Sequence, residues 1–132
     1  MLPGRRTRRL FGERGQSLAE FALVLPLMLV ILAAIIEFGR AMMTLNVASG
    51  AAREGVRVAA TGAGSGSARQ AAINVITAAG YDSYSVSVSG PDGNNNMRCT
   101  VTIRHTFLTG NLVPGLGGEL NISHTAVMRW EG

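Results

Sequence analysis

The sequence has few of the residues and motifs that carry chemistry in enzymes. Cys99 is the only cysteine among 132 residues, which excludes an intramolecular disulfide, and we interpret it as a small buried residue of a strand. No glycine-rich phosphate loop and no nucleophile elbow occurs, and no pair of acidic residues stands out. We therefore predict that the protein is not an enzyme, has no catalytic residues and needs no cofactor.

Metal-ligand patterns are scarce as well. His105 and His124 are the only histidines, and both fall on apolar faces of predicted strands, with Cys99 on the same face. Their spacing differs from the closely paired ligands of structural zinc sites, and no acidic ligand accompanies them. We interpret both as core or edge histidines and predict no metal site. The run that begins at Asp92 has Ile103 at the twelfth position, where a calcium loop needs glutamate, so we interpret it as a hairpin turn.

Charge is balanced everywhere except in one short segment. Residues 1–15 contain five arginines and one glutamate, whereas the rest of the chain contains seven arginines and seven acidic residues. A nucleic-acid-binding domain would carry clustered basic residues on its folded part, so we predict no nucleic-acid partner. Arginines that precede an apolar run are instead typical of the cytoplasmic side of a membrane span.

A long apolar run follows this basic segment. From Leu18 to Ile36 the only ionisable residue is Glu20, and the run has no polar face. Nineteen helical residues extend about 28 Å, close to the hydrocarbon thickness of a bilayer. We predict a single membrane-spanning helix with the N-terminus inside the cytoplasm and the C-terminal part outside, kinked at Pro26. A secretory signal peptide is the competing interpretation. However, the apolar run is longer than the apolar region of an ordinary signal peptide, and no clear signal-peptidase cleavage site follows the run.

The helical period continues beyond the span to about Ala60. One apolar stripe of this helix is predicted to cover a core. Two ion pairs can form on the polar side of the helix, between residues three positions apart: Glu37 with Arg40, and Glu54 with Arg57. The stripe comprises Phe38, Met42, Leu45, Ala48, Ala52, Val56 and Ala59.

Small residues along this part of the helix predict close packing against another element. Gly39, Gly50 and Gly55 are the candidates, because a glycine costs up to about 1 kcal/mol in a helix and therefore suggests a compensating contact or a flexible joint. Arg53 and Arg57 share a face, and we expect one of them to have an acidic partner elsewhere.

The pattern of the whole chain predicts an α+β fold. We expect no stable structure in the basic leader, then a transmembrane and extended N-terminal helix, a flexible linker, and a small extracytoplasmic domain. That domain contains a short helix over 67–80, capped by Ser67, and a three-stranded antiparallel sheet whose strands lie near 83–89, 97–108 and 120–130. The predicted segments are the leader 1–15, the helix 16–60, the linker 61–67 and the domain 68–132.

The junction between the leader and the span carries a recognisable spacing. Gly15 ends the basic segment, and Glu20 follows five positions later, inside the apolar run, where an unpaired carboxylate is costly. This arrangement resembles the processing site of type IV prepilins. The resemblance implies that a prepilin peptidase cuts after Gly15, that Gln16 becomes the new N-terminus, and that Glu20 pairs with the N-terminal amine of a neighbouring subunit. The alternative is a glutamate that snorkels to the lipid headgroups.

Three further segments make the resemblance narrower. They are EFALVLP at 20–26, EFGR at 37–40 and AAREGVR at 51–57. Together they are similar to the TadE-like family of pilin-related proteins from tight-adherence (Flp-type) pilus systems. The resemblance covers residues 15 to about 62 and also implies a pilin-like architecture.

The family resemblance implies a minor pilin-like subunit, or pseudopilin, that contributes to pilus assembly or cell adhesion in a bacterium. Its implied partners are the prepilin peptidase, other pilin-like subunits, tight-adherence assembly proteins and the membrane. It would reside in the cytoplasmic membrane and reach a cell-surface pilus after assembly. The alternative function is an uncleaved, signal-anchored envelope protein whose external domain binds a partner.

Overall fold

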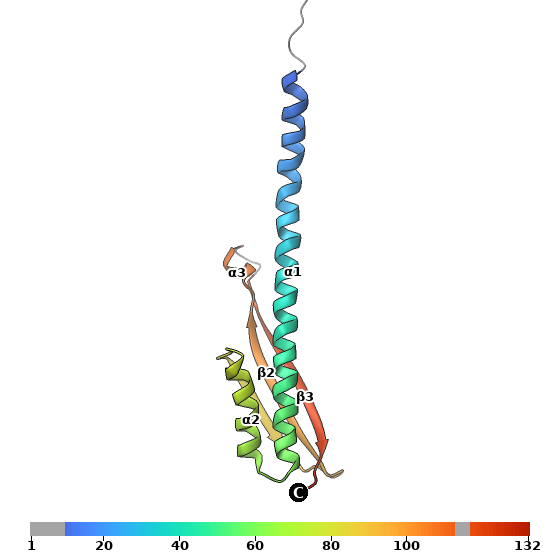
Figure 1. The fold of residues 1–132 in the computed structure, drawn as a ribbon, viewed down its shortest axis with the longest axis vertical. Coiled ribbons are helices and arrows are strands. Elements are labelled where there is room, and N and C mark those ends of the chain that lie inside the picture. Colours follow the sequence, from blue (N-terminus) through green and yellow to red (C-terminus); the bar gives the residue numbers. More distant parts are fainter. Residues whose placement is uncertain (1–9, 113–116) are drawn as a thin grey trace, which may run out of the picture. The chain divides into compact units, whose positions relative to one another are not determined.

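The fold is α+β, as predicted from the sequence (Figure 1). The computed structural model describes residues 10–112 and 117–132. The elements follow in the order α1 (Leu10–Ala60), α2 (Ser65–Ala78), β1 (Tyr84–Ser89), β2 (Asn96–Thr106), α3 (Thr109–Leu112) and β3 (Glu119–Arg129). The chain divides into two compact units between Ile36 and Glu37, inside α1, so the second part of α1 belongs to the same unit as the sheet.

The first unit contains the N-terminal part of α1. The helix begins at Leu10, so residues 10–14, which the sequence predicts to be unstructured, are helical; residues 1–9 lie outside the described part. Helix propagation adds one hydrogen bond per ordered residue, so a long helix readily extends by a few residues at its end. The helix continues through Pro26, and every large apolar side chain from Leu18 to Ile36 is exposed.

The second unit is built on the three-stranded antiparallel sheet that the alternating sequence predicts. The strand order is β1-β2-β3, so β2 is the central strand. Val86 pairs with Val101 in one ladder, and Val101 pairs with His124 in the other. Alternate residues of β2 are therefore buried on one face: Met97, Cys99, Val101, Ile103 and His105.

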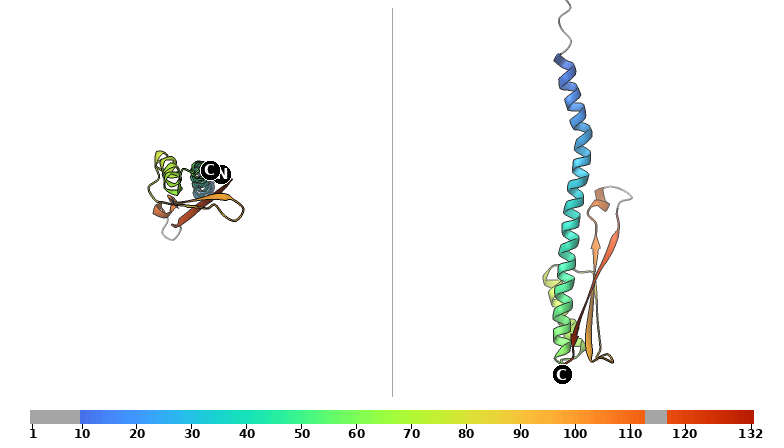
Figure 2. Two further views of the ribbon diagram at one scale, coloured as in Figure 1. Left: turned by 90° about the horizontal axis from the view of Figure 1, so that it is seen from below. Right: turned by 90° about the vertical axis from the view of Figure 1, so that its right-hand side faces the viewer.

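Both longer helices of this unit lie on the same face of the sheet, as the end-on view of Figure 2 shows. Small side chains fill the space where α1 meets α2, since Ala52 of α1 and Ala68 and Ala72 of α2 are fully buried. Larger residues, above all Val56, Ile76 and the β2 side chains, complete a single core. The opposite face of the sheet carries serine, threonine and arginine side chains, so the sheet alternates apolar and polar residues as a one-sided antiparallel sheet does.

The predicted apolar stripe of α1 is correct in its second half and wrong in its first. Ala48, Ala52, Val56 and Ala59 are buried, but Phe38 and Met42 are exposed. In their place the helix buries two polar residues, Glu37 and Thr44. Polar partners on the sheet and its flanking loop make this burial favourable, and a stripe drawn from apolar residues alone does not include such partners.

The connection from α1 to α2 is shorter than the predicted linker. Ser67 is not the N-cap, because α2 begins at Ser65 and Gly64 occupies the capping position without a side-chain hydrogen bond. Gly64 has φ of 90°, a conformation that suits glycine, and its carbonyl accepts the first helical bond from the Ala68 amide at 3.1 Å. Positions 65–67 are therefore helical.

The segment that begins at Asp92 is a hairpin turn, as predicted. One oxygen of its carboxylate, Oδ1, accepts backbone hydrogen bonds from Asn94 and Asn96, both at 2.9 Å. These bonds, that from Asn96 foremost, lower the pKa of the Asp92 carboxyl together with the nearby charge of Arg98. The carboxylate thus stabilises the turn itself.

Candidate processing site and buried polar cluster

The predicted cleavage position lies in the first turns of α1. Gly15 and Gln16 are exposed, and no atom outside the helix lies within 4 Å of the place where a Gly15 side chain would begin. The peptide bond between them has only about one and a half helical turns before it, counted from Leu10. A peptidase can therefore reach it after the end of the helix has opened, which is the least costly part of a helix to open.

Glu20 lies one turn after Gln16 on the same side of α1. The Gln16 side-chain amide donates a hydrogen bond to the Glu20 carboxylate, with Nε2 and Oε1 separated by 3.2 Å. The carboxylate is exposed and points back towards the first turn, as helical side chains do. It is thus directed to the position at which a new N-terminus would lie after cleavage at Gly15.

The three candidate packing glycines differ in their surroundings. A Cβ atom added at Gly39 or Gly50 would meet nothing within 4 Å, so neither glycine packs against another element among the residues that the structure describes. Gly55 is buried, and a Cβ atom there would lie 2.7 Å from Cys99 Sγ and 3.1 Å from Ala72 Cβ. The sheet and α2 therefore approach α1 most closely at Gly55.

Gly55→Ala is expected to destabilise the second unit, whereas Gly50→Ala is expected to stabilise it. Overpacking costs about 1–3 kcal/mol, and alanine recovers up to about 1 kcal/mol of helix propensity at either position. Urea unfolding of the full chain in detergent, followed by the fluorescence of the single tryptophan, Trp130, measures both changes. Cys99→Ala should relieve part of the Gly55→Ala cost, and equal effects at the two glycines would contradict this packing.

Arg53 and Arg57 are both exposed on α1. Arg57 forms a two-armed ion pair with Glu54, with distances of 2.7 and 3.0 Å, so its acidic partner is on the same helix and not elsewhere. Arg53 has no hydrogen-bond or ion-pair partner among the described residues. Its guanidinium therefore remains available to a group outside this chain.

A buried polar cluster joins α1 to the end of β2. Glu37 Oε1 lies 3.1 Å from His105 Nε2 and 3.0 Å from the Arg40 guanidinium, while Oε2 accepts the Leu108 amide at 3.0 Å. The other ring nitrogen of His105 lies 3.1 Å from the hydroxyl of Thr44. The cluster thus holds the C-terminal end of β2 against the first turns of α1 after the apolar run.

The hydroxyl of Thr44 is at the centre of this cluster. It lies 3.1 Å from the Arg40 carbonyl and 3.0 Å from the Tyr81 hydroxyl, besides its contact with His105. Thr44 has one hydrogen, which it can donate to the Arg40 carbonyl, the Tyr81 hydroxyl or the imidazole. An ionised carboxylate only accepts, so His105 Nε2 donates the hydrogen of its contact with ionised Glu37. No buried side-chain polar atom of the described residues lacks a partner.

Sequence reasoning missed this cluster, although it named several of the residues. The Glu37–Arg40 pair forms as predicted, but Glu37 is buried and not on the polar side of the helix. His105 was interpreted as a core or edge histidine with no partner assigned, and its partner is Glu37, 68 positions earlier. The alternation of β2 correctly placed His105 on the inner face, and a buried histidine implies a polar partner; the spacing alone could not identify it.

The remaining candidate residues, Cys99 and His124, do not come together in the described structure. Cys99 is fully buried, as predicted, and burial raises the pKa of its thiol. His124 is half-buried on β3 and pairs with Val101, so it lies away from the row of His105 in the sheet. Within residues 10–112 and 117–132, no group of three or more metal-ligating side chains comes together.

Comparison with known proteins supports the resemblance seen in the sequence. Residues 15–57 match the family model described as TadE-like protein, which confirms the predicted similarity over 43 of the 132 residues. No curated protein and no solved structure matches the chain. The matched segment begins at Gly15 and contains Glu20, the apolar run, the Glu37–Arg40 pair and Gly55. Over this segment the chain is similar to the TadE-like family.

Proposed function

We propose that the protein is a minor pilin-like subunit of a tight-adherence pilus, processed by a prepilin peptidase. The observation that carries this proposal is the family match, which begins at Gly15 itself and extends through the helix to Arg57. The geometry supports it, because Gly15 and Gln16 are exposed near the start of α1 and Glu20 is directed towards them. The major subunits of such pili are much shorter than this chain, so the resemblance implies a minor role.

The membrane supplies the first environment of the subunit. Within the described part of the chain, α1 is the one helix long and apolar enough to cross a bilayer. The arginines of residues 1–15 favour an N-terminus in the cytoplasm, with the second unit outside. Cleavage after Gly15 would remove all five of these arginines, whose charge otherwise retains the N-terminus at the inner surface.

Assembly would replace lipid by neighbouring helices around the same apolar side chains. All large apolar residues from Leu18 to Ile36 are exposed in this chain, so they are available to other pilin-like subunits. Glu20 is the one ionisable residue of that surface, and a charge in an apolar environment is stable only when it is paired. The N-terminal amine of an adjacent processed subunit is a suitable partner.

The test of this proposal is the start of the mature chain. We expect co-expression with the prepilin peptidase of the same pilus system to yield a protein that begins at Gln16, measured by intact mass and N-terminal sequencing. Gly15→Leu should leave the protein at full length in the membrane fraction, while Gly39→Leu, a glycine with open surroundings on the same helix, should be processed normally.

A chain that still carries residues 1–15 in the presence of active peptidase would overturn the processing step. The protein would then be an uncleaved, signal-anchored envelope protein whose external domain binds a partner. Normal cleavage of a known prepilin in the same cells shows that the peptidase is active.

A further inference from the structure

The outer face of the sheet carries a regular array of hydroxyl groups. Ser85, Thr102 and Ser123 stand side by side on the three strands, and the next row contains Ser87, Thr100 and Thr125. Hydrogen bonds between neighbours, at 2.6 Å for Thr102 with Ser123 and 2.9 Å for Thr100 with Thr125, fix their orientation. In each bonded pair one hydroxyl donates to the other, so one hydrogen remains for an outside acceptor.

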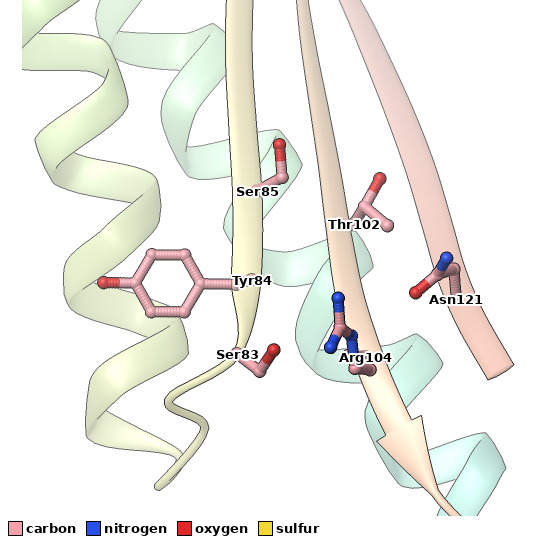
Figure 3. A pocket seen from close by; sticks show the side chains of 6 residues that line it. All are labelled: Ser83, Tyr84, Ser85, Thr102, Arg104 and Asn121. Carbon is pink, nitrogen blue, oxygen red and sulfur yellow. The ribbon is translucent and has the colours of Figure 1, made fainter. Parts of the chain in front are cut away.

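One end of this array is hollowed into a polar pocket of about 210 Å³. Figure 3 shows the side chains of Ser83 and Asn121 on either side of the Arg104 guanidinium, with Ser85 and Thr102 next to them, whereas the Tyr84 ring points away. The backbone holds this geometry, since the Arg104 amide donates to the Ser83 carbonyl at 3.0 Å.

Arg104 retains most of its hydrogen-bonding capacity in the pocket. Its only ion-pair partner in the described structure is Glu119, at 3.5 Å, and the two side chains are 52% and 58% exposed. Such an exposed pair is weak, and an arginine has five donor hydrogens, so the guanidinium can bind a second carboxylate without losing the first. The pocket thus offers one cation surrounded by hydroxyl and amide groups.

We propose that this pocket binds an acidic saccharide, with Arg104 on the carboxylate of one uronic-acid unit and the serine, threonine and asparagine side chains on its hydroxyls. Groups that both donate and accept match sugar hydroxyls, and a single cation matches one carboxylate per unit. Sites for drug-sized ligands have volumes of roughly 300–1,000 Å³. The pocket is smaller than these sites, and its size suits a single sugar ring. The next row of hydroxyls offers contacts to an adjoining unit.

Competing ligand classes fit the pocket less well. An apolar ligand would find only polar side chains in the pocket apart from Tyr84, whose ring points away. A polyphosphate or nucleic acid needs several cations, whereas Glu119 partly compensates the single arginine here. The proposal does not depend on pilus incorporation, because the pocket is lined only by residues of the sheet and by Ser83, which directly precedes β1, all in the second unit.

Saturation-transfer NMR on the full chain in nanodiscs tests the site. The acidic ligand is oligogalacturonate, and the control ligand is a neutral galactose oligomer of equal length. We expect the acidic oligomer to bind with a Kd on the order of 1 mM or tighter. Arg104→Gln should weaken binding at least about tenfold, because charge-assisted hydrogen bonds are the strong ones. The control is Arg98→Gln, which removes an equally exposed arginine from the same strand and face, and binding should change less than about twofold.

The other outcomes overturn the proposal. Equal losses in the two variants would show diffuse charge attraction, and equal binding of the neutral oligomer would show that the carboxylate of the ligand contributes nothing. Displacement of the oligomer by sulfate at the same concentration would identify a simple anion site. Absence of saturation transfer at 10-fold the expected Kd, on the scale of about 10 mM, would show that no saccharide binds.

Discussion

Thr44→Val is expected to lower the free energy of unfolding of the second unit by about 2–3 kcal/mol, because it leaves buried polar groups without partners. Valine has nearly the shape of threonine, so the change removes the hydroxyl and little else. His105 Nδ1 then loses its only described partner within 3.5 Å, and the half-buried Tyr81 hydroxyl loses its contact as well. The Arg40 carbonyl loses the hydrogen bond that it accepts from the Thr44 hydroxyl but keeps its place in the helix.

The matched control is Thr100→Val, the same chemical change on the outer face of the sheet. Thr100 also makes a hydroxyl hydrogen bond, to Thr125 at 2.9 Å, but Thr100 is only half-buried and Thr125 is exposed, so water can replace that partner. Its effect should remain within about 0.5 kcal/mol. Urea unfolding of the full chain in detergent, with Trp130 as the fluorescent probe, gives both values.

A double-mutant cycle assigns the effect to the cluster. Tyr81→Phe removes one hydroxyl partner of Thr44, so its cost and that of Thr44→Val should be less than additive if the contact at 3.0 Å contributes. A Thr44→Val cost no larger than that of Thr100→Val would show that the cluster does not stabilise the fold.

The parts of the fold that the sequence predicted correctly are those that depend on local pattern. The strands around β2 alternate so regularly that the residue pattern alone assigns Cys99 and His105 to the inner face, and both are buried. The end of α1 at Ala60 and the hairpin turn at Asp92 likewise follow from periodicity and turn residues. In these segments the local preference and the tertiary environment agree.

The parts that the sequence did not predict depend on contacts between distant residues. Glu37 and His105 are 68 positions apart, and neither a charge pattern nor a spacing rule links them. The same contact explains why Phe38 and Met42 are exposed: α1 turns its polar residues Glu37 and Thr44 towards β2. Apolar periodicity identifies a buried face only where that face is apolar.

The candidate site shows the same division. Gly15, Gln16 and Glu20 were identified from a motif, and the structure places them at the exposed start of α1. Among the packing glycines, only Gly55 contacts other elements within the described part of the chain, where Cys99 and Ala72 approach it from two different elements. A glycine in a helix has the same sequence signature whether it faces a neighbour or solvent, so only the tertiary packing distinguishes Gly50 from Gly55.

The proposed pair between Glu20 and the N-terminal amine of a neighbouring subunit leads to a second prediction, which rests on the proposed pilin function. Glu20→Ala should reduce incorporation into filaments at least about tenfold and leave the amount in the membrane fraction unchanged. The carboxylate is needed only when lipid and headgroups are replaced by apolar helices, where an unpaired N-terminal amine of a neighbour would remain uncompensated. The control is Glu54→Gln, which neutralises a half-buried glutamate of the same helix, outside the apolar run, and should not affect incorporation.

The composition of the chain permits a direct test of the pair. The sequence contains no lysine, so the only amine that this protein can supply to a carbodiimide cross-link is its N-terminal α-amine. Assembled filaments treated with a carbodiimide should yield a peptide in which the Glu20 side chain is joined to the first residue of a neighbouring subunit. Mixing subunits of ordinary and ¹⁵N-labelled isotopic composition distinguishes this bond from one within a single chain.

The two experiments together separate assembly from pairing. If Glu20→Ala enters filaments normally, the pairing hypothesis is wrong, whatever the start of the mature chain. If the cross-link forms only within one chain, Glu20 neutralises its own N-terminus, as its present hydrogen bond to Gln16 at 3.2 Å would favour. A cross-link between chains, together with loss of incorporation in Glu20→Ala, would show that the charge left in the apolar run determines how each subunit aligns with the next.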